Sequence, residues 1–308
     1  MLSKIRKGLA EPHLIVPGLA ACIARISLVS DKAAVDLRYR SLFHSRVNFE
    51  NPRGFNEKLQ WLKLHDRNPQ YVRMVDKILA KEWASNLIGS DHVPKIYGVW
   101  DDFGSIPFED LPQSFVLKTN HDSGGVVICP DSRSLDKDSA RKKLTKHLRK
   151  NYFYGGREWP YGQIDRKIFA EQYLLPENFA ADLADYKLFC FPNGRIVTLV
   201  CENRFSDGPM NKTFLDEDWN ILPIVEGGHP INDKCKRPDG FCQMKEFASL
   251  LSEGLPFARV DFFESNGTVY FGELTLYPNS GYERFAPEEW DTIFGSWVDL
   301  TRAYSANE

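Results

Sequence analysis

The 308-residue chain lacks the sequence features that mark several large classes of protein. Its six cysteines form no Cys-x-x-Cys pair, which argues against a zinc site of that spacing and favours reduced thiols in the cytoplasm. The 39 basic and 42 acidic residues give a net charge of −3, so no basic excess favours nucleic acid as a partner. The Rossmann pattern Gly-x-Gly-x-x-Gly and the Walker order Gly-Lys-Ser/Thr are also absent. These absences favour a globular cytoplasmic protein without the commonest nucleotide-binding motifs.

The chain also lacks an apolar run long enough to cross a bilayer. The run at 14–29 follows Lys4, Arg6 and Lys7, as in a signal peptide, but Pro17 and Arg25 interrupt it. We therefore expect a helix that lies against the rest of the protein. Weak peripheral attachment to a membrane surface is the alternative.

The most informative feature that is present is a pair of strand-like segments joined by Asn266-Gly267. A two-residue turn at that position would place Asp261 opposite Gly272. Asp261 lies opposite Glu273 only if the turn contains three residues or if a bulge shifts the register. We predict one of these two irregularities.

The side chains of this hairpin suit a metal site. Arg259 and Asp261 share one face of the first strand, and Glu273 and Thr275 share a face of the second. Two carboxylates this close repel each other unless a cation lies between them, and oxygen ligands suit Mg²⁺. Asp261 and Glu273 are therefore predicted metal ligands, with an ordinary exposed ion pair as the alternative.

A second candidate site is the segment 117–126, in which Lys118 ends an apolar strand and Ser123, Gly124 and Gly125 form a small loop. A flexible backbone with free N–H groups can surround phosphate oxygens, and a lysine adds a positive charge. A Gly-Gly pair alone is more often a hairpin turn. His121 is interpreted as a hydrogen-bonding loop residue, with direct catalysis as the alternative.

The remaining pattern predicts α+β layers, with antiparallel hairpins and flanking helices. Helices are expected over 31–70, with Asn56 as a cap after a break, over 69–86 with Lys77 inside, over 139–151 and over 243–252. Strands are expected at 93–100, 114–118, 126–129, 168–174 and 186–191, and a long loop at 207–239. We divide the chain into a helical region 1–75, a central lobe 76–170 and a C-terminal lobe 171–308.

The order of these motifs resembles the ATP-grasp superfamily. Lys77 precedes Lys118 and its glycine loop, then come a Glu-x-Tyr-Leu segment at Glu171, an Arg-x-Asp and a Glu-x-Thr. Within that superfamily, residues 45–285 are similar to the TupA-like family. The matching segments are FNEKLQWLK at 55–63, VDK at 75–77, LPQSFVLKTNH at 111–121, DYKLFCF at 185–191 and GELTLYPNSG at 272–281.

The resemblance implies two α+β lobes that clamp ATP, with Mg²⁺ held by the late Asp and Glu. It implies that the two lysines and the glycine loop hold the phosphates and that the Glu-x-Tyr segment presents backbone groups to adenine. The residues implied to contact ATP are Lys77, Lys118, Ser123, Gly124, Gly125, Glu171, Tyr173, Leu174, Asp185 and Lys187. Arg259 and Lys118 are the implied catalytic residues. Most ATP-grasp enzymes have Glu-x-Asn where this chain has Glu273-Leu-Thr275, so Thr275 is the third expected metal ligand, with Asn279 as a substitute.

The resemblance further implies a carboxylate–amine ligase of bacterial surface polysaccharide synthesis. The expected substrates are an amino acid or amino sugar and a uronic acid, free or linked to a nucleotide or lipid. Arg204 is a candidate for orienting the acid, and the loop 203–240 for selecting it. A kinase-like phosphoryl transferase and an inactive nucleotide-binding scaffold remain the alternatives.

Overall fold

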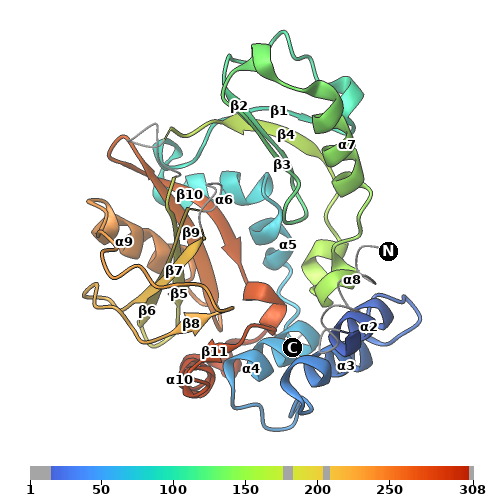
Figure 1. The fold of residues 1–308 in the computed structure, drawn as a ribbon, viewed down its shortest axis with the longest axis vertical. Helices are drawn as coiled ribbons and strands as arrows, with labels where there is room; N and C mark the ends of the chain where they lie inside the picture. The colour runs from blue at the N-terminus through green and yellow to red at the C-terminus, as the bar shows by residue number, and fades with distance from the viewer. Residues whose placement is uncertain (1–14, 176–182, 204–208, 305–308) are drawn as a thin grey trace.

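The computed structural model describes residues 15–175, 183–203 and 209–304. Two antiparallel sheets form most of the α+β architecture, one in the upper part of Figure 1 and one at its left. A group of helices lies at the lower right, where the N-terminal and C-terminal parts of the chain come together (Figure 1). α5 (Gln70–Val75) and α6 (Leu79–Ile88) run between the two sheets.

The upper sheet has the strand order β1-β4-β2-β3. Its strands are β1 (Ile96–Trp100), β2 (Phe115–Thr119), β3 (Val126–Cys129) and β4 (Ile168–Gln172). One face packs Phe115, Leu117 and Ile168 against Ala140 and Leu144 of α7 (Lys137–Leu148). Because side chains alternate along a strand, Lys118 and Glu171 lie on the opposite face.

The second sheet has the order β10-β9-β5-β6-β7. Its strands are β5 (Asp185–Cys190), β6 (Ile196–Glu202), β7 (Asn211–Leu215), β9 (Ala258–Ser265) and β10 (Thr268–Thr275). Val260 and Phe262 of β9 join the large core with Met244 and Phe247 of α9 (Phe241–Leu251) and with Ala84 of α6. The alternate residues Arg259 and Asp261 face away from that core side.

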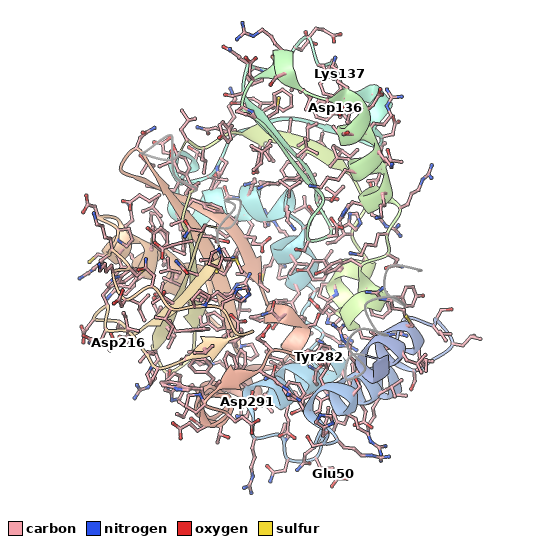
Figure 2. All side chains as sticks on the ribbon, in the orientation of Figure 1. Glu50, Asp136, Lys137, Asp216, Tyr282 and Asp291 are labelled. Carbon is pink, nitrogen blue, oxygen red and sulfur yellow. The ribbon has the colours of Figure 1, made fainter. Side chains whose placement is uncertain are left out.

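Two helices from distant parts of the chain pack together in the lower part of the molecule, where Figure 2 labels Asp291. α4 (Phe55–His65) packs on α10 (Glu289–Trp297), with the Phe55 and Phe294 ring centroids 5.9 Å apart. The remaining elements are α2 (Ile15–Ile23), α3 (Asp31–Phe43), α8 (Phe153–Gly156), β8 (Val225–Glu226), β11 (Phe285–Ala286), η2 (Ser90–His92), η3 (Phe103–Ser105), η4 (Ser132–Ser134), η5 (Trp159–Gly162), η6 (Pro278–Gly281) and η7 (Leu300–Arg302).

Three local predictions were wrong. The helix expected over 69–86 is two helices, because Asp76 Oδ1 accepts hydrogen bonds from the Ile78 and Leu79 N–H groups at 2.8 and 3.4 Å and starts a new helix there. Lys77 therefore lies between α5 and α6. Asn56 lies inside α4 rather than capping it, since Gly54 is the N-cap. The segment 207–239 contains β7 and β8, which the glycine and proline content obscured.

The upper sheet extends two residues beyond the predicted end of the central lobe, because Glu171 and Gln172 pair with Val116 and Phe115 of β2. The division into 1–75, 76–170 and 171–308 stays a prediction. In the part of the chain that the structure describes, no helix is long and apolar enough to cross a membrane.

Candidate active site

The β9–β10 hairpin places the two predicted metal carboxylates opposite each other. Ser265 pairs with Thr268 across the two-residue turn, and a register shift between Phe271 and Glu273 leaves Gly272 as a bulge. Glu273 then pairs with Asp261. The predicted bulge is confirmed. Gly272 suits this position because a Cβ there would lie 3.0 Å from the Asp261 carbonyl oxygen.

Arg259 is the centre of the hairpin cluster. Its Nε and Nη2 donate to the two carboxylate oxygens of Asp261 at 2.7 and 2.8 Å, and Nη2 also donates to Thr275 Oγ1 at 3.1 Å and to Glu273 Oε1 at 3.5 Å. Burial alone would lower the pKa of Arg259, but the carboxylates of Asp261 and Glu273 raise it. The guanidinium therefore stays charged and holds the three oxygen-bearing side chains together.

Two lysines complete the charge balance of the hairpin. Lys187 Nζ lies 2.6 Å from both Asp261 Oδ2 and Asp185 Oδ2, and Lys77 Nζ lies 3.5 Å from Glu273 Oε2. Burial alone would raise the pKa of Glu273, but Lys77, Arg259 and Lys187 lower it to about 2. Three cations thus face three carboxylates, and an arriving polyphosphate would compete with the carboxylates for the lysines.

A second ion cluster joins α6 to the upper sheet. Glu171 contacts Lys118 through one carboxylate oxygen and lies 3.0 Å from Lys81 Nζ through the other. Burial would raise the pKa of Glu171, but Lys118 and Lys81 lower it to about 2. Sequence reasoning missed Lys81. A signal existed, because Lys81 lies at helical spacing from the buried residues Ala84 and Ile88 and so falls on the buried side of its helix.

Asp122 holds the glycine loop at 123–125 in place through its hydrogen bonds. Sequence reasoning also missed this residue. The fully buried Asp122 carboxylate accepts from Thr119 Oγ1 and contacts His147 Nδ1, both at 2.5 Å. The Asp122 carbonyl accepts from Lys77 Nζ at 2.8 Å. A Cβ on Gly125 would overlap the Thr119 hydroxyl, so this close turn requires glycine. The loop is therefore fixed on one side to α7 and on the other to the hairpin through Lys77.

His121 is buried, and its Nε2 lies 3.0 Å from the Lys150 carbonyl oxygen. This contact agrees with the interpretation of His121 as a hydrogen-bonding loop residue. Arg204 lies outside the residues that the structure describes.

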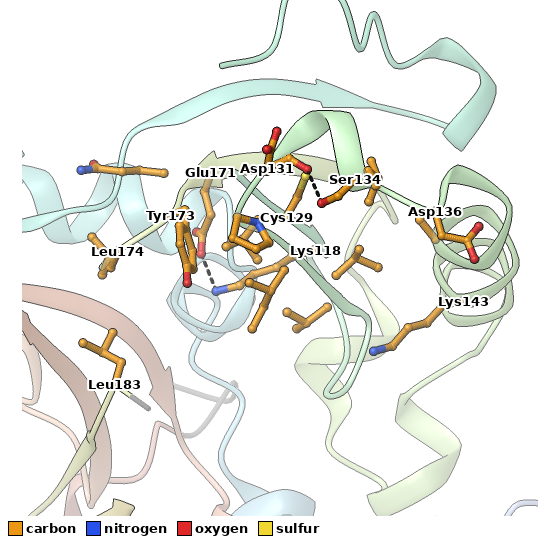
Figure 3. Close-up of a pocket in the computed structure, with 18 of the residues that line it drawn as sticks. Lys118, Cys129, Asp131, Ser134, Asp136, Lys143, Glu171, Tyr173, Leu174 and Leu183 are labelled. Atoms are coloured by element: carbon orange, nitrogen blue, oxygen red, sulfur yellow. Dashed lines mark hydrogen bonds and ion pairs between the residues drawn. The ribbon is translucent and has the colours of Figure 1, made fainter. Parts of the chain in front are cut away.

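A cavity of about 770 Å³ lies between the two sheets. Figure 3 shows Lys118, Glu171, Tyr173, Leu174 and Leu183 around it, with Lys143 extending towards it from α7. Gly124, Asp185 and Phe263 complete the part that faces the hairpin. The volume and the mostly apolar wall with few charged groups suit a nucleotide-sized ligand. Six predicted ATP contacts, Lys118, Gly124, Glu171, Tyr173, Leu174 and Asp185, line this cavity, whereas Lys77 and Lys187 belong to the hairpin cluster.

Two of these residues have partners that the sequence did not indicate. The Glu171 carboxylate pairs with both Lys118 and Lys81, and the sequence indicated neither ion pair. Asp185 is buried and pairs with Lys187, two residues further along β5. Asn279 Nδ2 donates to Glu226 Oε1 at 2.7 Å, away from the hairpin carboxylates.

The hairpin oxygens fit Mg²⁺ bound together with a polyphosphate. Among the described residues, no group of three or more His, Cys, Asp and Glu is placed to hold a metal ion by itself. Asp261 and Glu273 supply two carboxylates, and Mg²⁺ usually takes one or two carboxylates and completes its shell with phosphate and water. The Thr275 hydroxyl lies on the same cluster.

The two sheets, the cavity between them and the glycine loop define the ATP-grasp fold. The match to a sequence model of the TupA-like ATP-grasp family covers residues 57–299, and the chain belongs to that family. No curated protein matches the chain.

The solved structures to which the chain is similar include ligases of low sequence identity. L-amino acid ligase from Bacillus licheniformis is 15% identical with a TM-score of 0.46, over 89% of this chain and 62% of that one. D-alanine–D-alanine ligase from Helicobacter pylori is 14% identical with a TM-score of 0.44, over 82% and 68% of the two chains. The ATP complex of D-alanine–D-alanine ligase from Bacillus anthracis is 16% identical with a TM-score of 0.38, over 66% and 54%.

Proposed function

We propose that this protein is an ATP- and Mg²⁺-dependent carboxylate–amine ligase. The observation that carries the proposal is the meeting of Arg259, Asp261, Glu273 and Thr275 on one hairpin beside a nucleotide-sized cavity that contains Lys118. Membership of an ATP-grasp family supports the same reading.

The reaction has two steps. A carboxylate oxygen of the acid attacks the γ-phosphorus of ATP, and the bond to the β-phosphate bridging oxygen breaks, giving an acyl phosphate and ADP. The amine nitrogen then attacks the acyl carbon, phosphate leaves with the electron pair of the C–O bond, and the nitrogen loses a proton. The products are an amide, ADP and phosphate.

The residues of the chain position the reactants and neutralise charge. Lys118 and Lys77 bind phosphate oxygens and the N–H groups of the 123–125 loop orient them, while Tyr173 and Leu174 enclose the base. Arg259 stabilises negative charge on the transferring phosphoryl group. Asp261, Glu273 and Thr275 would hold Mg²⁺, which offsets phosphate charge when bound. Lys187 gives up part of its contact with Asp261 to reach the γ-phosphate.

For the substrates, we propose an amino acid or amino sugar joined to a uronic acid in the synthesis of a bacterial surface polysaccharide, in the cytoplasm or at the inner face of the membrane. The motifs shared with the family support this class of substrate. Irregular segments suit the selection of substrates, because they vary while the scaffold stays fixed. The segment 203–240, and in it the irregular connections around β7 and β8, is therefore the proposed selector.

The test is a matrix of acids and amines incubated with the protein, ATP and Mg²⁺, read out as ADP release and product mass. A ligase releases ADP in proportion to amide and only when both partners are present. ADP release that needs an acid or sugar but no amine would indicate a kinase-like transferase instead. ATP binding without ADP release for any pair would indicate a scaffold.

A further inference from the structure

α4 carries a polar face that is completely buried. Asn56, Gln60 and Lys63, at positions i, i+4 and i+7, lie on one side of the helix and are 2%, 0% and 1% exposed. A surface helix usually turns such residues to solvent and buries an apolar stripe. Buried polar groups persist where they have specific partners, so the contacts of this face are informative.

All three side chains hold the segment that follows the β9–β10 hairpin. We call this hairpin the metal hairpin, because it carries the predicted metal ligands Asp261 and Glu273. Gln60 Nε2 donates to the Ser280 and Gly281 carbonyl oxygens at 3.0 and 2.6 Å, and Lys63 Nζ donates to the Ser280 carbonyl at 2.5 Å. Asn56 Nδ2 donates to the Glu283 carbonyl at 2.8 Å. These contacts join residues more than 200 positions apart in the sequence.

The held segment has an unusual backbone. Asn279, Ser280 and Gly281 have φ values of 47°, 56° and 63°, so three consecutive residues lie in the left-handed region. Residues other than glycine adopt this region rarely, and a run of them persists only where the surroundings enforce it. Donors that bind the Ser280 and Gly281 carbonyls provide that enforcement.

The turn borders the candidate active site. Ser280 lies five residues after Thr275, the last residue of β10. Its hydroxyl contacts the buried Glu158. A displaced turn would therefore disturb the end of β10 that carries Glu273 and Thr275.

We infer that Gln60 and Lys63, with Asn56 beside them, are positioning residues that hold the 279–281 turn and through it the end of the metal hairpin. They act through the turn and do not themselves meet a substrate. This role explains why the segment FNEKLQWLK at 55–63 has polar residues on the buried side of its helix. Those buried polar residues are Asn56, Gln60 and Lys63.

The test compares Gln60→Met and Lys63→Met with Lys58→Met. Lys58 is on the same helix and donates to a carbonyl oxygen, that of Val298 at 2.8 Å, but does not contact the turn. Hydrogen exchange measured by mass spectrometry on the full-length proteins should show faster exchange over 277–283 in the first two variants and not in Lys58→Met. Gln60→Met changes no charge. If Lys63→Met does not fold, Gln60→Met alone tests whether these side chains hold the turn.

The kinetic part rests on the proposed ligase activity, whereas the exchange part does not. We expect kcat to fall on the order of a hundredfold in Gln60→Met and Lys63→Met, as for a small misplacement of catalytic groups, with ATP affinity within about twofold of the parent. Unchanged exchange over 277–283 in both variants would overturn the inference, whatever the activity. Faster exchange with unchanged kcat would show that these residues hold the turn but that the position of the turn does not affect the reaction. That result would overturn the claim that they position the end of the metal hairpin.

Discussion

Lys81 and Glu171 form an ion pair of 3.0 Å whose side chains are only 4% and 5% exposed. The other Glu171 oxygen contacts Lys118, which is 22% exposed and lines the nucleotide-sized cavity. Burying a carboxylate is costly unless cations surround it, so the triad is stable only with both lysines charged. Lys81 therefore determines how strongly Glu171 attracts Lys118, the residue proposed to bind phosphate.

Lys81→Met should weaken ATP binding. Without Lys81, Glu171 is neutralised by Lys118 alone and holds it more firmly away from the nucleotide, so the dissociation constant should rise about tenfold, equivalent to about 1.4 kcal/mol. Calorimetric titration with ATP and Mg²⁺ measures this change. Lys95→Met, at an exposed site, is the control and should bind as the parent does. Equal affinities in the two variants would separate Lys81 from the site.

Asp261→Asn and Glu273→Gln should abolish turnover while leaving the fold intact. Each change removes one of the two carboxylates proposed to hold Mg²⁺ beside the transferring phosphate, and loss of such a group commonly costs at least about a hundredfold in rate. ADP release measures turnover, and circular dichroism checks the fold. Glu82→Gln, an exposed carboxylate on α6, is the control. Parent-like ADP release in either hairpin variant would contradict the metal assignment.

Gly272→Ala should disturb the bulge that aligns these carboxylates. The new Cβ would lie 3.0 Å from the Asp261 carbonyl oxygen and 3.0 Å from the Phe263 ring, so one strand must shift. We expect the free energy of unfolding to fall by about 1 kcal/mol or more, with a larger loss of ADP release. Gly18→Ala, where a Cβ meets no atom within 4 Å, is the matched control. A Gly272→Ala protein as stable and active as that control would mean that the register does not depend on glycine.

The hairpin could be predicted from sequence because period-two alternation fixes which residues share a face, and the numbering of Asp261 and Glu273 then requires an irregularity. The ion cluster of Lys81, Glu171 and Lys118 could not be predicted from sequence, because Lys81 and Glu171 are 90 positions apart and no local pattern pairs them. The break at Asp76 was missed because the apolar pattern on both sides is helical, and the capping bond appears only when Asp76 is seen to accept from Ile78 and Leu79. Long-range polar contacts, such as those of Gln60 with the 280–281 carbonyls, leave no mark in periodicity.

Glu171 should make stability depend on pH in the acid range. Its pKa is about 2 in the folded protein against 4.5 when unperturbed. A carboxyl group with a lowered folded pKa contributes stability above the unfolded value and loses it as the pH falls through the folded value. Urea unfolding of the parent and of Glu171→Gln should therefore differ most near neutral pH. The difference should shrink between about pH 4.5 and pH 2. A difference that stays constant down to pH 2 would contradict the assigned pKa.

The central claim, that the cavity and the hairpin together bind ATP with Mg²⁺, is tested most directly by calorimetric titration of the full-length protein with ATP, with and without Mg²⁺. Lys118→Ala provides the comparison. We predict binding at micromolar to sub-millimolar ATP that strengthens with Mg²⁺ and weakens in Lys118→Ala. No heat of binding under either condition, or binding that Lys118→Ala leaves unchanged, would contradict the claim.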